Sequence, residues 1–537
     1  MRRALILISS AGLMLCVLAL PNHPGQMSFS GMAYWPIELS VLLFAMLAAG
    51  QGRGLATAAA LALVALTALK LADMASFAAY NRGFNPVSDL FLVEAGLSLL
   101  RDSIGPMRTV LLVLGAFMAT AILFTLLRGG LKAWQRLVLP APARALALVG
   151  VLATSGWAVA DTGHHLGYWS FAQSPPGSAR TTRVAVARIG DARETVAELA
   201  RFKRAAQDDP MRDIAGVFDR LQGRDLLLIW IESYGRASFD NPEYSGTHTA
   251  TLRGAEADLR EAGLAMKSGW LTSPTAGGQS WLAHGALNSG LWTSDNARYS
   301  AMIASGQKWL FHFAQAAGYR TAAVMPAITM AWPESAAMGF DLVFEAEDIP
   351  YTGAPFNWVT MPDQFTLAAY GDLLSEDPRP DFVQIALISS HAPWTPVPRM
   401  LPWEAIGDGS EFSEMAGQGP SPRELWKDRD AVRDAYRRSV DYALQAVFSH
   451  VARLGEAAPL VIVAGDHQAA GFVAGSDNKD VPVHMIAPPE VLGFIEAWGW
   501  SDGLIPSAAA PVRRMDSFRD DFIRAFTSME QIAGVRE

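Results

Sequence analysis

Residues 225–231, DLLLIWI, form an unbroken apolar run of strand length, and the carboxylate Glu232 follows it directly. Two later runs have the same character, DFVQIALIS at 381–389 and PLVIVAG at 459–465. Continuous hydrophobicity is typical of strands that are buried on both faces, as in a parallel sheet covered by helices. Helical patterns such as DAYRRSVDYALQAVFSHVARLG lie between the runs. The alternation predicts a doubly wound α/β domain.

Residues with metal-binding or catalytic side chains follow each of these three runs. Glu232 follows the first run, and His391 lies just beyond the second. Asp466 and His467 directly follow the third. In open α/β sheets, ligands bind beyond the carboxyl ends of the strands. Each residue alone could be an ordinary surface or capping group, but delivery of all of them to one sheet edge favours a functional site. Glutamate, aspartate and histidine suit one divalent cation, which we expect to be Zn²⁺ or Mn²⁺.

The stretch SPTAGGQSWLAHGALNSG, residues 273–290, places Ser280 at the expected start of a helix. Serine is a common N-cap residue, so capping is the ordinary interpretation. A cation held by the carboxylates and histidine at the strand ends would leave a coordination position for the Ser280 hydroxyl, which would then lose its proton at neutral pH. The helix start also favours an anion such as phosphate. The two roles are compatible, and we interpret Ser280 as a nucleophile and metal ligand. His284, one turn later, is either a phosphate contact or a structural histidine.

The first part of the chain is nearly all apolar, whereas the remainder has the charge mix of a soluble protein. Five apolar segments predict five membrane-spanning helices, at about residues 4–21, 35–50, 54–73, 109–127 and 144–160. No clear cleavage site follows the first segment, so we expect a retained anchor rather than a secretion signal. Lys70 and Asp73, at the end of the third segment, are expected to snorkel to the membrane interface.

Positive charge predicts the orientation of these spans. Arg2 and Arg3 precede the first span, and Arg53 separates the second and third. Four further basic residues lie between the fourth and fifth spans: Arg128, Lys132, Arg136 and Arg144. By the positive-inside rule the N-terminus is cytoplasmic. Five crossings would place everything after about residue 161 on the periplasmic side of an inner membrane. We therefore expect a transmembrane domain at 1–160, a connector at 161–220 and an extracytoplasmic catalytic domain at 221–537.

The length, net charge and cysteine content of the chain exclude some classes of function and of metal site. At 537 residues the chain is too long for one ordinary domain. Its formal net charge of −9 argues against a nucleic-acid partner, which would select for a basic surface. The only cysteine, Cys16, lies in the first apolar segment. A disulfide or a cysteine-ligated metal site within the rest of the chain is therefore excluded.

The motifs, taken in order, resemble those of membrane-anchored transferases of the alkaline phosphatase/sulfatase superfamily, the lipoteichoic acid synthases and lipid A phosphoethanolamine transferases. The resemblance covers about residues 222–490, with the motifs LLLIWIESYG, PTAGGQSWLAHGALNSG, AGYRTAAV with GFDLVF, ISSHAPWTPVP, SVDYAL and VIVAGDHQ. It implies an alkaline-phosphatase-like fold. It also implies four ligands of one catalytic metal ion: Glu232, Ser280, Asp466 and His467.

The resemblance further implies how a substrate would be held. His391, in the SHAPW segment, corresponds to a family histidine that contacts the transferred group. Trp332 corresponds to an aromatic residue of the head-group pocket. The surrounding ITMAWPES departs from the family's basic and histidine-bearing pattern. Met325, shortly before this stretch, and Glu334, within it, stand where polar or cationic contacts are expected. The identity of the transferred group therefore stays open.

The function implied is transfer of a phospholipid-derived phospho-head group, of phosphoglycerol or phosphoethanolamine type, to a glycan or lipid acceptor through phospho-Ser280. A membrane-bound phosphodiesterase or sulfatase-type hydrolase is the alternative. Sulfatases that form formylglycine need an arginine soon after the modified residue. The residues after Ser280 are Trp, Leu, Ala and His, so a sulfatase of this kind is disfavoured. A non-catalytic membrane sensor of this fold would be expected to lack the ligand set, which is complete here.

Overall fold

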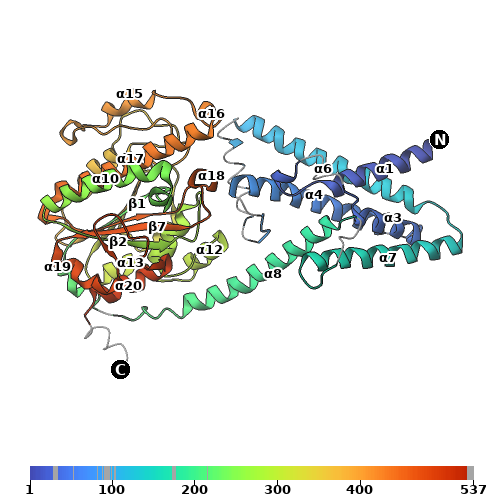
Figure 1. Cartoon of the computed structure of the whole chain (residues 1–537), viewed down its shortest axis with the longest axis horizontal. Helices are drawn as coiled ribbons and strands as arrows, with labels where there is room; N and C mark the ends of the chain where they lie inside the picture. Colours follow the sequence, from blue (N-terminus) through green and yellow to red (C-terminus); the bar gives the residue numbers. More distant parts are fainter. Residues whose placement is uncertain are drawn as a thin grey trace. The chain divides into compact units, whose positions relative to one another are not determined.

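The computed structural model describes residues 1–27, 34–52, 54–80, 83–87, 89, 93, 97, 100–101, 105–171, 177–214 and 216–528, so the predicted loop charge Arg53 lies outside the described residues. The chain forms two compact units, Met1–Glu198 and Leu199–Glu537, each containing the elements drawn in Figure 1. The predicted connector at 161–220 contributes residues to both units.

The N-terminal unit contains a helix in each of the five predicted apolar segments: α1 (Arg2–Ala19), α3 (Ile37–Ala49), α4 (Leu55–Tyr80), α6 (Pro106–Gln135) and α7 (Ala141–His165). Four of them, α1, α4, α6 and α7, are long and apolar enough to cross a membrane. Helix α3 has 13 residues. Its length of about 20 Å is less than the roughly 30 Å of a bilayer core. The described residues thus provide four helices of spanning length, where the sequence predicts five.

Lys70 and Asp73 lie inside the N-terminal unit, with exposed fractions of 2% and 0%. The Lys70 ammonium donates to Thr181 Oγ1 at 2.8 Å, and Asp73 pairs with Arg188 at 3.1 Å. Both partners lie on helix α8 (Arg180–Gln207), more than 100 residues further along the chain. The expectation that Lys70 and Asp73 snorkel to the membrane interface is therefore wrong. It was based on the neighbouring sequence alone, whereas the partners of both charges lie far away in sequence.

The C-terminal unit is built on one nine-stranded mixed sheet with the order β4-β3-β5-β1-β6-β7-β2-β8, in which β9 also pairs with β2. The strands are β1 (Leu226–Ile231), β2 (Ala265–Thr272), β3 (Arg320–Met325), β4 (Leu342–Glu345), β5 (Asp381–Ala386), β6 (Leu460–Gly465), β7 (Asp480–Ala487), β8 (Ser501–Asp502) and β9 (Val512–Arg514). From β4 to β6 all neighbours are parallel, whereas β7 is antiparallel to both β6 and β2. The predicted α/β class is confirmed, and the sheet is mixed rather than wholly parallel.

Helices cover both faces of this sheet, as Figure 1 shows. The side chains of β1 alternate between two buried cores, with Leu228 and Trp230 in one and Leu227 and Ile229 in the other. The first core also contains residues of α11 (Ser280–Ser289), α13 (Leu310–Ala316) and α20 (Phe518–Phe526). The second contains residues of α10 (Pro242–Glu261), α14 (Asp363–Leu373) and α17 (Arg429–Leu454). Burial of β1 on both faces explains its unbroken apolar sequence.

Candidate active site

The site lies where β1 and β6 end. These strands pair in parallel, with Ile231 opposite Gly465. The residues that follow, Glu232 and Asp466, therefore come out side by side. Together with His467 they offer ligand atoms that all lie within 4.8 Å of one another, and all three residues are buried. We call these three residues the donor cluster.

Ser280 adjoins the donor cluster. It is the first residue of α11, and the N-cap is Gln279, which has a left-handed backbone with φ of 67°. The Ser280 hydroxyl donates to Glu232 Oε2 at 2.7 Å and lies 3.4 Å from His467 Nε2. Ser280 therefore does not cap α11, and its hydroxyl points to the donor cluster, as the interpretation of Ser280 as a metal ligand requires.

Neighbouring groups fix the orientation of the donor cluster. The Ser233 backbone N–H donates to Asp466 Oδ1 at 2.8 Å, and Ser390 Oγ donates to the Glu232 carbonyl at 2.6 Å. His467 Nδ1 lies 3.0 Å from the Gln468 carbonyl, which requires the proton on Nδ1. Nε2 then faces the carboxylates, 3.1 Å from Glu232 Oε1, as a metal-binding histidine would require.

Gly465 allows the close approach that brings β6 to the site. A Cβ atom at this position would overlap the carbonyl oxygen of Tyr234. Any side chain here would push Asp466 away from the end of β1.

The charges of the donor cluster suit a cation. Burial raises the pKa of Asp466, and the adjacent charge of Glu232 raises it further. Burial acts in the same direction on Glu232, but the charge and hydrogen bond of His467 outweigh it and hold the Glu232 pKa well below its usual range. Burial lowers the pKa of His467, yet the two carboxylates raise it to about 9. Asp466 and His467 thus hold extra protons beside the ionised Glu232, and a divalent cation with oxygen and imidazole ligands fits in the place of these protons.

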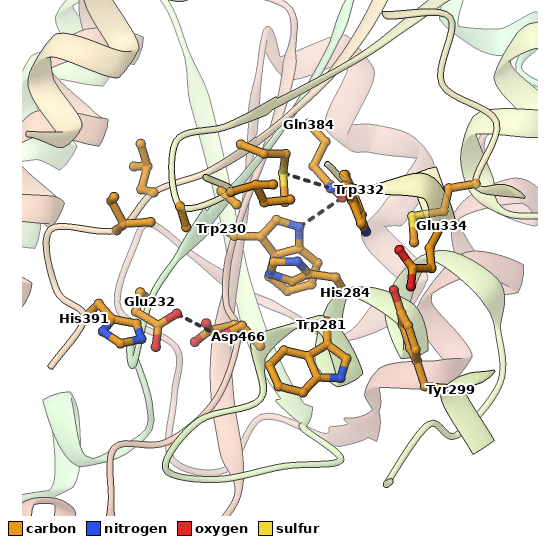
Figure 2. Close-up of a pocket in the computed structure, with 18 of the residues that line it drawn as sticks. Trp230, Glu232, Trp281, His284, Tyr299, Trp332, Glu334, Gln384, His391 and Asp466 are labelled. Atoms are coloured by element: carbon orange, nitrogen blue, oxygen red, sulfur yellow. Dashed lines mark hydrogen bonds between the residues drawn. The ribbon is translucent and has the colours of Figure 1, made fainter. Parts of the chain in front are cut away.

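The donor cluster adjoins a cavity of about 720 Å³. Glu232, Asp466 and Ser280 line it, and His467 lies behind them with an exposed fraction of 1%. The other residues predicted to contact a substrate also line this cavity: His284, Trp332 and His391. Figure 2 shows His391 beside Glu232 and Trp332 at the opposite end. Six of the seven predicted site residues therefore line one cavity, and the seventh, His467, belongs to the adjoining donor cluster.

His284 has an unused polar atom at this cavity. Its Nε2 is buried and has no hydrogen-bond partner among the described residues. Its ring packs on Trp230 with a centroid distance of 4.3 Å. Burial lowers the pKa of His284 to about 3, so the ring is neutral at physiological pH. A neutral imidazole with a free buried nitrogen favours the predicted substrate contact over a purely structural role.

Asp363 is a positioning residue that the sequence did not reveal. It begins α14 and is fully buried. One carboxylate oxygen accepts the backbone N–H groups of Ile388 and Ser389 at 2.9 and 2.8 Å. These bonds fix the loop that leads to His391. The sequence signal is only an aspartate after proline at a helix start, which is common.

We expect Asp363→Ala to lower the free energy of unfolding by about 2–3 kcal/mol, because it leaves two buried N–H groups without an acceptor. Turnover should fall as well, since the loop before His391 loses its anchor. Thermal denaturation and activity assays would measure both effects. Asp372→Ala, on the exposed face of the same helix, is the control and should change neither. Equal behaviour of the two variants would show that Asp363 has no positioning role.

Comparison with known proteins agrees with this fold. Residues 224–480 match the model of the Sulfatase family. The comparison with curated proteins returns no match.

The similar solved structures include both transferases and hydrolases. The lipoteichoic acid synthase LtaP from Listeria monocytogenes is 12% identical, with 61% of this chain and 78% of that chain covered and a TM-score of 0.36. The phosphoglycerol transferase GacH from Streptococcus pyogenes, in complex with sn-glycerol-1-phosphate, is 13% identical, with coverages of 62% and 82% and a TM-score of 0.38. The C-terminal periplasmic domain of EptC from Escherichia coli, in complex with Zn, is 15% identical, with coverages of 50% and 74% and a TM-score of 0.33.

At these identities and TM-scores the likeness assigns neither a substrate nor an activity. The matched residues 224–480 contain β1 and β6 and the site at their ends. Residues 224–480 thus form a domain similar to the Sulfatase family, preceded by N-terminal apolar helices.

Proposed function

We propose that this protein transfers a phospho-head group from a membrane phospholipid to a glycan or lipid acceptor, through a covalent intermediate on Ser280. The observation that carries the proposal is the Ser280 hydroxyl, which donates to Glu232 at 2.7 Å and lines a cavity wide enough for a head group. The start of α11 supports it, because the first N–H groups of a helix lack internal partners and favour phosphate oxygens. Apolar helices of spanning length would keep such an enzyme at its lipid substrate.

In the first step, Ser280 Oγ forms a bond to phosphorus, and the bond from phosphorus to the diacylglycerol oxygen breaks. Glu232 takes the Ser280 proton along the existing hydrogen bond, and protonated His391 gives a proton to the leaving oxygen. In the second step, an acceptor hydroxyl gives its proton to His391 and attacks phosphorus. The bond to Ser280 breaks, and Glu232 returns the proton to Ser280.

Glu232, Asp466 and His467, with Ser280, would hold one divalent ion, Mn²⁺ or Zn²⁺. When bound, the ion would neutralise the carboxylates and stabilise negative charge on Ser280 and the phosphoryl oxygens. The remaining catalytic work falls to the protein. Ser280 is positioned by α11, and His391 is positioned by the Asp363-anchored loop.

The test is incubation of the purified full chain with phospholipids and a candidate glycan or lipid acceptor, followed by lipid mass spectrometry. We expect diacylglycerol to appear together with a head-group-modified acceptor. Diacylglycerol together with free phospho-head group, whether or not acceptor is present, would instead establish the hydrolase alternative. Release of neither product would contradict both functions.

We further propose that the sulfatase-like domain lies on the periplasmic side of the inner membrane. Reporters fused after about residue 170 test this orientation. Alkaline phosphatase, which needs an oxidising compartment, should be active there, whereas a fluorescent protein that folds only in the cytoplasm should be dark. The same pair fused within the basic loop after α6, near Arg136, should give the opposite pattern. A fluorescent reporter after residue 170 would contradict the proposed orientation.

A further inference from the structure

The cavity wall far from the donor cluster is aromatic and acidic. Figure 2 shows Glu232 and Asp466 at one end of the cavity, and Trp332, Glu334 and Tyr299 at the other. A phosphodiester with its phosphorus at Ser280 would extend its head group along this cavity. Two acyl chains are too large to follow, so they would remain outside. The far wall therefore faces the part of the head group that distinguishes one phospholipid from another.

Trp281, which follows Ser280, lies between the donor cluster and this wall, and the rings of Trp281 and Trp332 are held in place. Trp281 Nε1 donates to Asn296 Oδ1 at 2.8 Å, so the polar edge of this indole already has its partner. The Trp332 backbone N–H donates to Glu345 at 3.0 Å, and its ring packs 6.2 Å from Phe340. These contacts hold the rings of Trp281 and Trp332 in place before a ligand binds.

Glu334 contributes a negative charge beside these rings. Burial raises the pKa of Tyr299, and the nearby charge of Glu334 raises it further, as expected for the proximity of the two side chains in Figure 2. Among the described residues that line the cavity there is no Lys or Arg. Glu334 is exposed to solvent at the cavity, and a cationic group of a ligand would pair with its charge.

We propose that Trp281, Tyr299, Trp332 and Glu334 form a subsite for a quaternary ammonium group, so that the transferred head group is of phosphocholine type. The inference rests on the proposed function and specifies its donor. Aromatic faces attract cations, and alkylated ammonium groups are the usual ligands of such cages. The methyl groups pack on the rings and require no hydrogen bonds.

Other head groups fit this wall less well. A primary ammonium has three N–H donors to satisfy, and the hydroxyls of glycerol also need partners. The Asn296 amide oxygen already accepts from Trp281, which leaves the Glu334 carboxylate and the Tyr299 hydroxyl as the acceptors at this wall. A polar group left without a partner in a partly buried site weakens binding. A glycerol head group would in addition leave the Glu334 charge uncompensated.

The experiment compares phosphatidylcholine, phosphatidylethanolamine and phosphatidylglycerol with identical acyl chains, by release of the common product diacylglycerol. We expect kcat/KM for phosphatidylcholine to exceed that for phosphatidylglycerol by about tenfold or more, which is the ratio expected for a cation–π contact with a supporting charge. Glu334→Gln and Trp332→Leu should each reduce this ratio about fivefold or more. Glu347→Gln, which removes an exposed carboxylate of the same region outside the cavity, is the matched control and should preserve the ratio.

A second measurement separates this inference from the proposed function. Calorimetry with phosphocholine and with glycerol 3-phosphate measures binding without turnover. We expect phosphocholine to bind more tightly than glycerol 3-phosphate, and Glu334→Gln to weaken the binding of phosphocholine only. If no phospholipid is turned over but this preference is present, the transfer reaction is wrong and the subsite stands. Equal binding of the two compounds, or a donor ratio that Glu334→Gln leaves unchanged, would overturn the subsite.

Discussion

Ser280→Ala is expected to reduce diacylglycerol release by about 10³-fold or more, because it removes the atom that forms the covalent intermediate. The fold should persist. Ser280 does not cap α11, and its loss removes one side-chain hydrogen bond with Glu232, a change of about 1 kcal/mol. Turnover and thermal denaturation of the same preparation would measure both quantities.

Two controls make this result specific. Ser280→Thr keeps a hydroxyl at the same position and should retain measurable turnover. Ser300→Ala removes a hydroxyl from the same cavity without touching the donor cluster and should stay within a few-fold of the wild type. If Ser280→Ala turned over phospholipid at the wild-type rate, Ser280 would have no covalent role and the proposed mechanism would be wrong.

Substitutions in the donor cluster should reduce activity about as much as Ser280→Ala does. They should also reduce metal binding, which can be measured without an activity assay. We expect the wild-type chain to bind one divalent ion and to melt at a higher temperature when Mn²⁺ or Zn²⁺ is added, because a ligand of the folded state stabilises it. His467→Ala and Asp466→Asn should lose most of this binding and about 10³-fold or more of the activity. Elemental analysis of dialysed protein measures the ion directly.

His391→Gln separates metal binding from catalysis. His391 lines the cavity but is not in the donor cluster, so this variant should keep the ion and lose turnover. Metal affinity should also rise with pH, because His467, with a pKa of about 9, must release its proton to become a ligand. Affinity that is independent of pH between 6 and 9, or full metal content in His467→Ala, would contradict the assignment of the ligands.

The sequence predicted the α/β class and the meeting point of the site residues for a physical reason. Strands buried on both faces have continuous apolar runs, and parallel neighbours end at one edge of the sheet. Glu232 and Asp466 therefore had to meet once β1 and β6 were paired. The direction of β7 could not be predicted in the same way, because the apolar pattern of a buried strand is the same whether it runs parallel or antiparallel.

Other features depend on contacts between residues far apart in sequence. Lys70 and Asp73 are buried because helix α8 supplies their partners, and local hydropathy carries no information about that packing. Asp363 appears ordinary until its carboxylate is seen to accept two N–H groups of another loop. The aromatic and acidic wall was visible in the sequence only as a departure from the family pattern around Trp332.

The central claim is a covalent phospho-head group on Ser280, and the most direct test is to trap it. The chain is mixed with phospholipid in the absence of acceptor, quenched in acid within the first turnover and digested for peptide mass spectrometry. We expect the peptide containing Ser280 to gain the mass of one phospho-head group, and Ser280→Ala to give no adduct. Diacylglycerol release without any adduct on Ser280, or an adduct on another residue, would contradict the account.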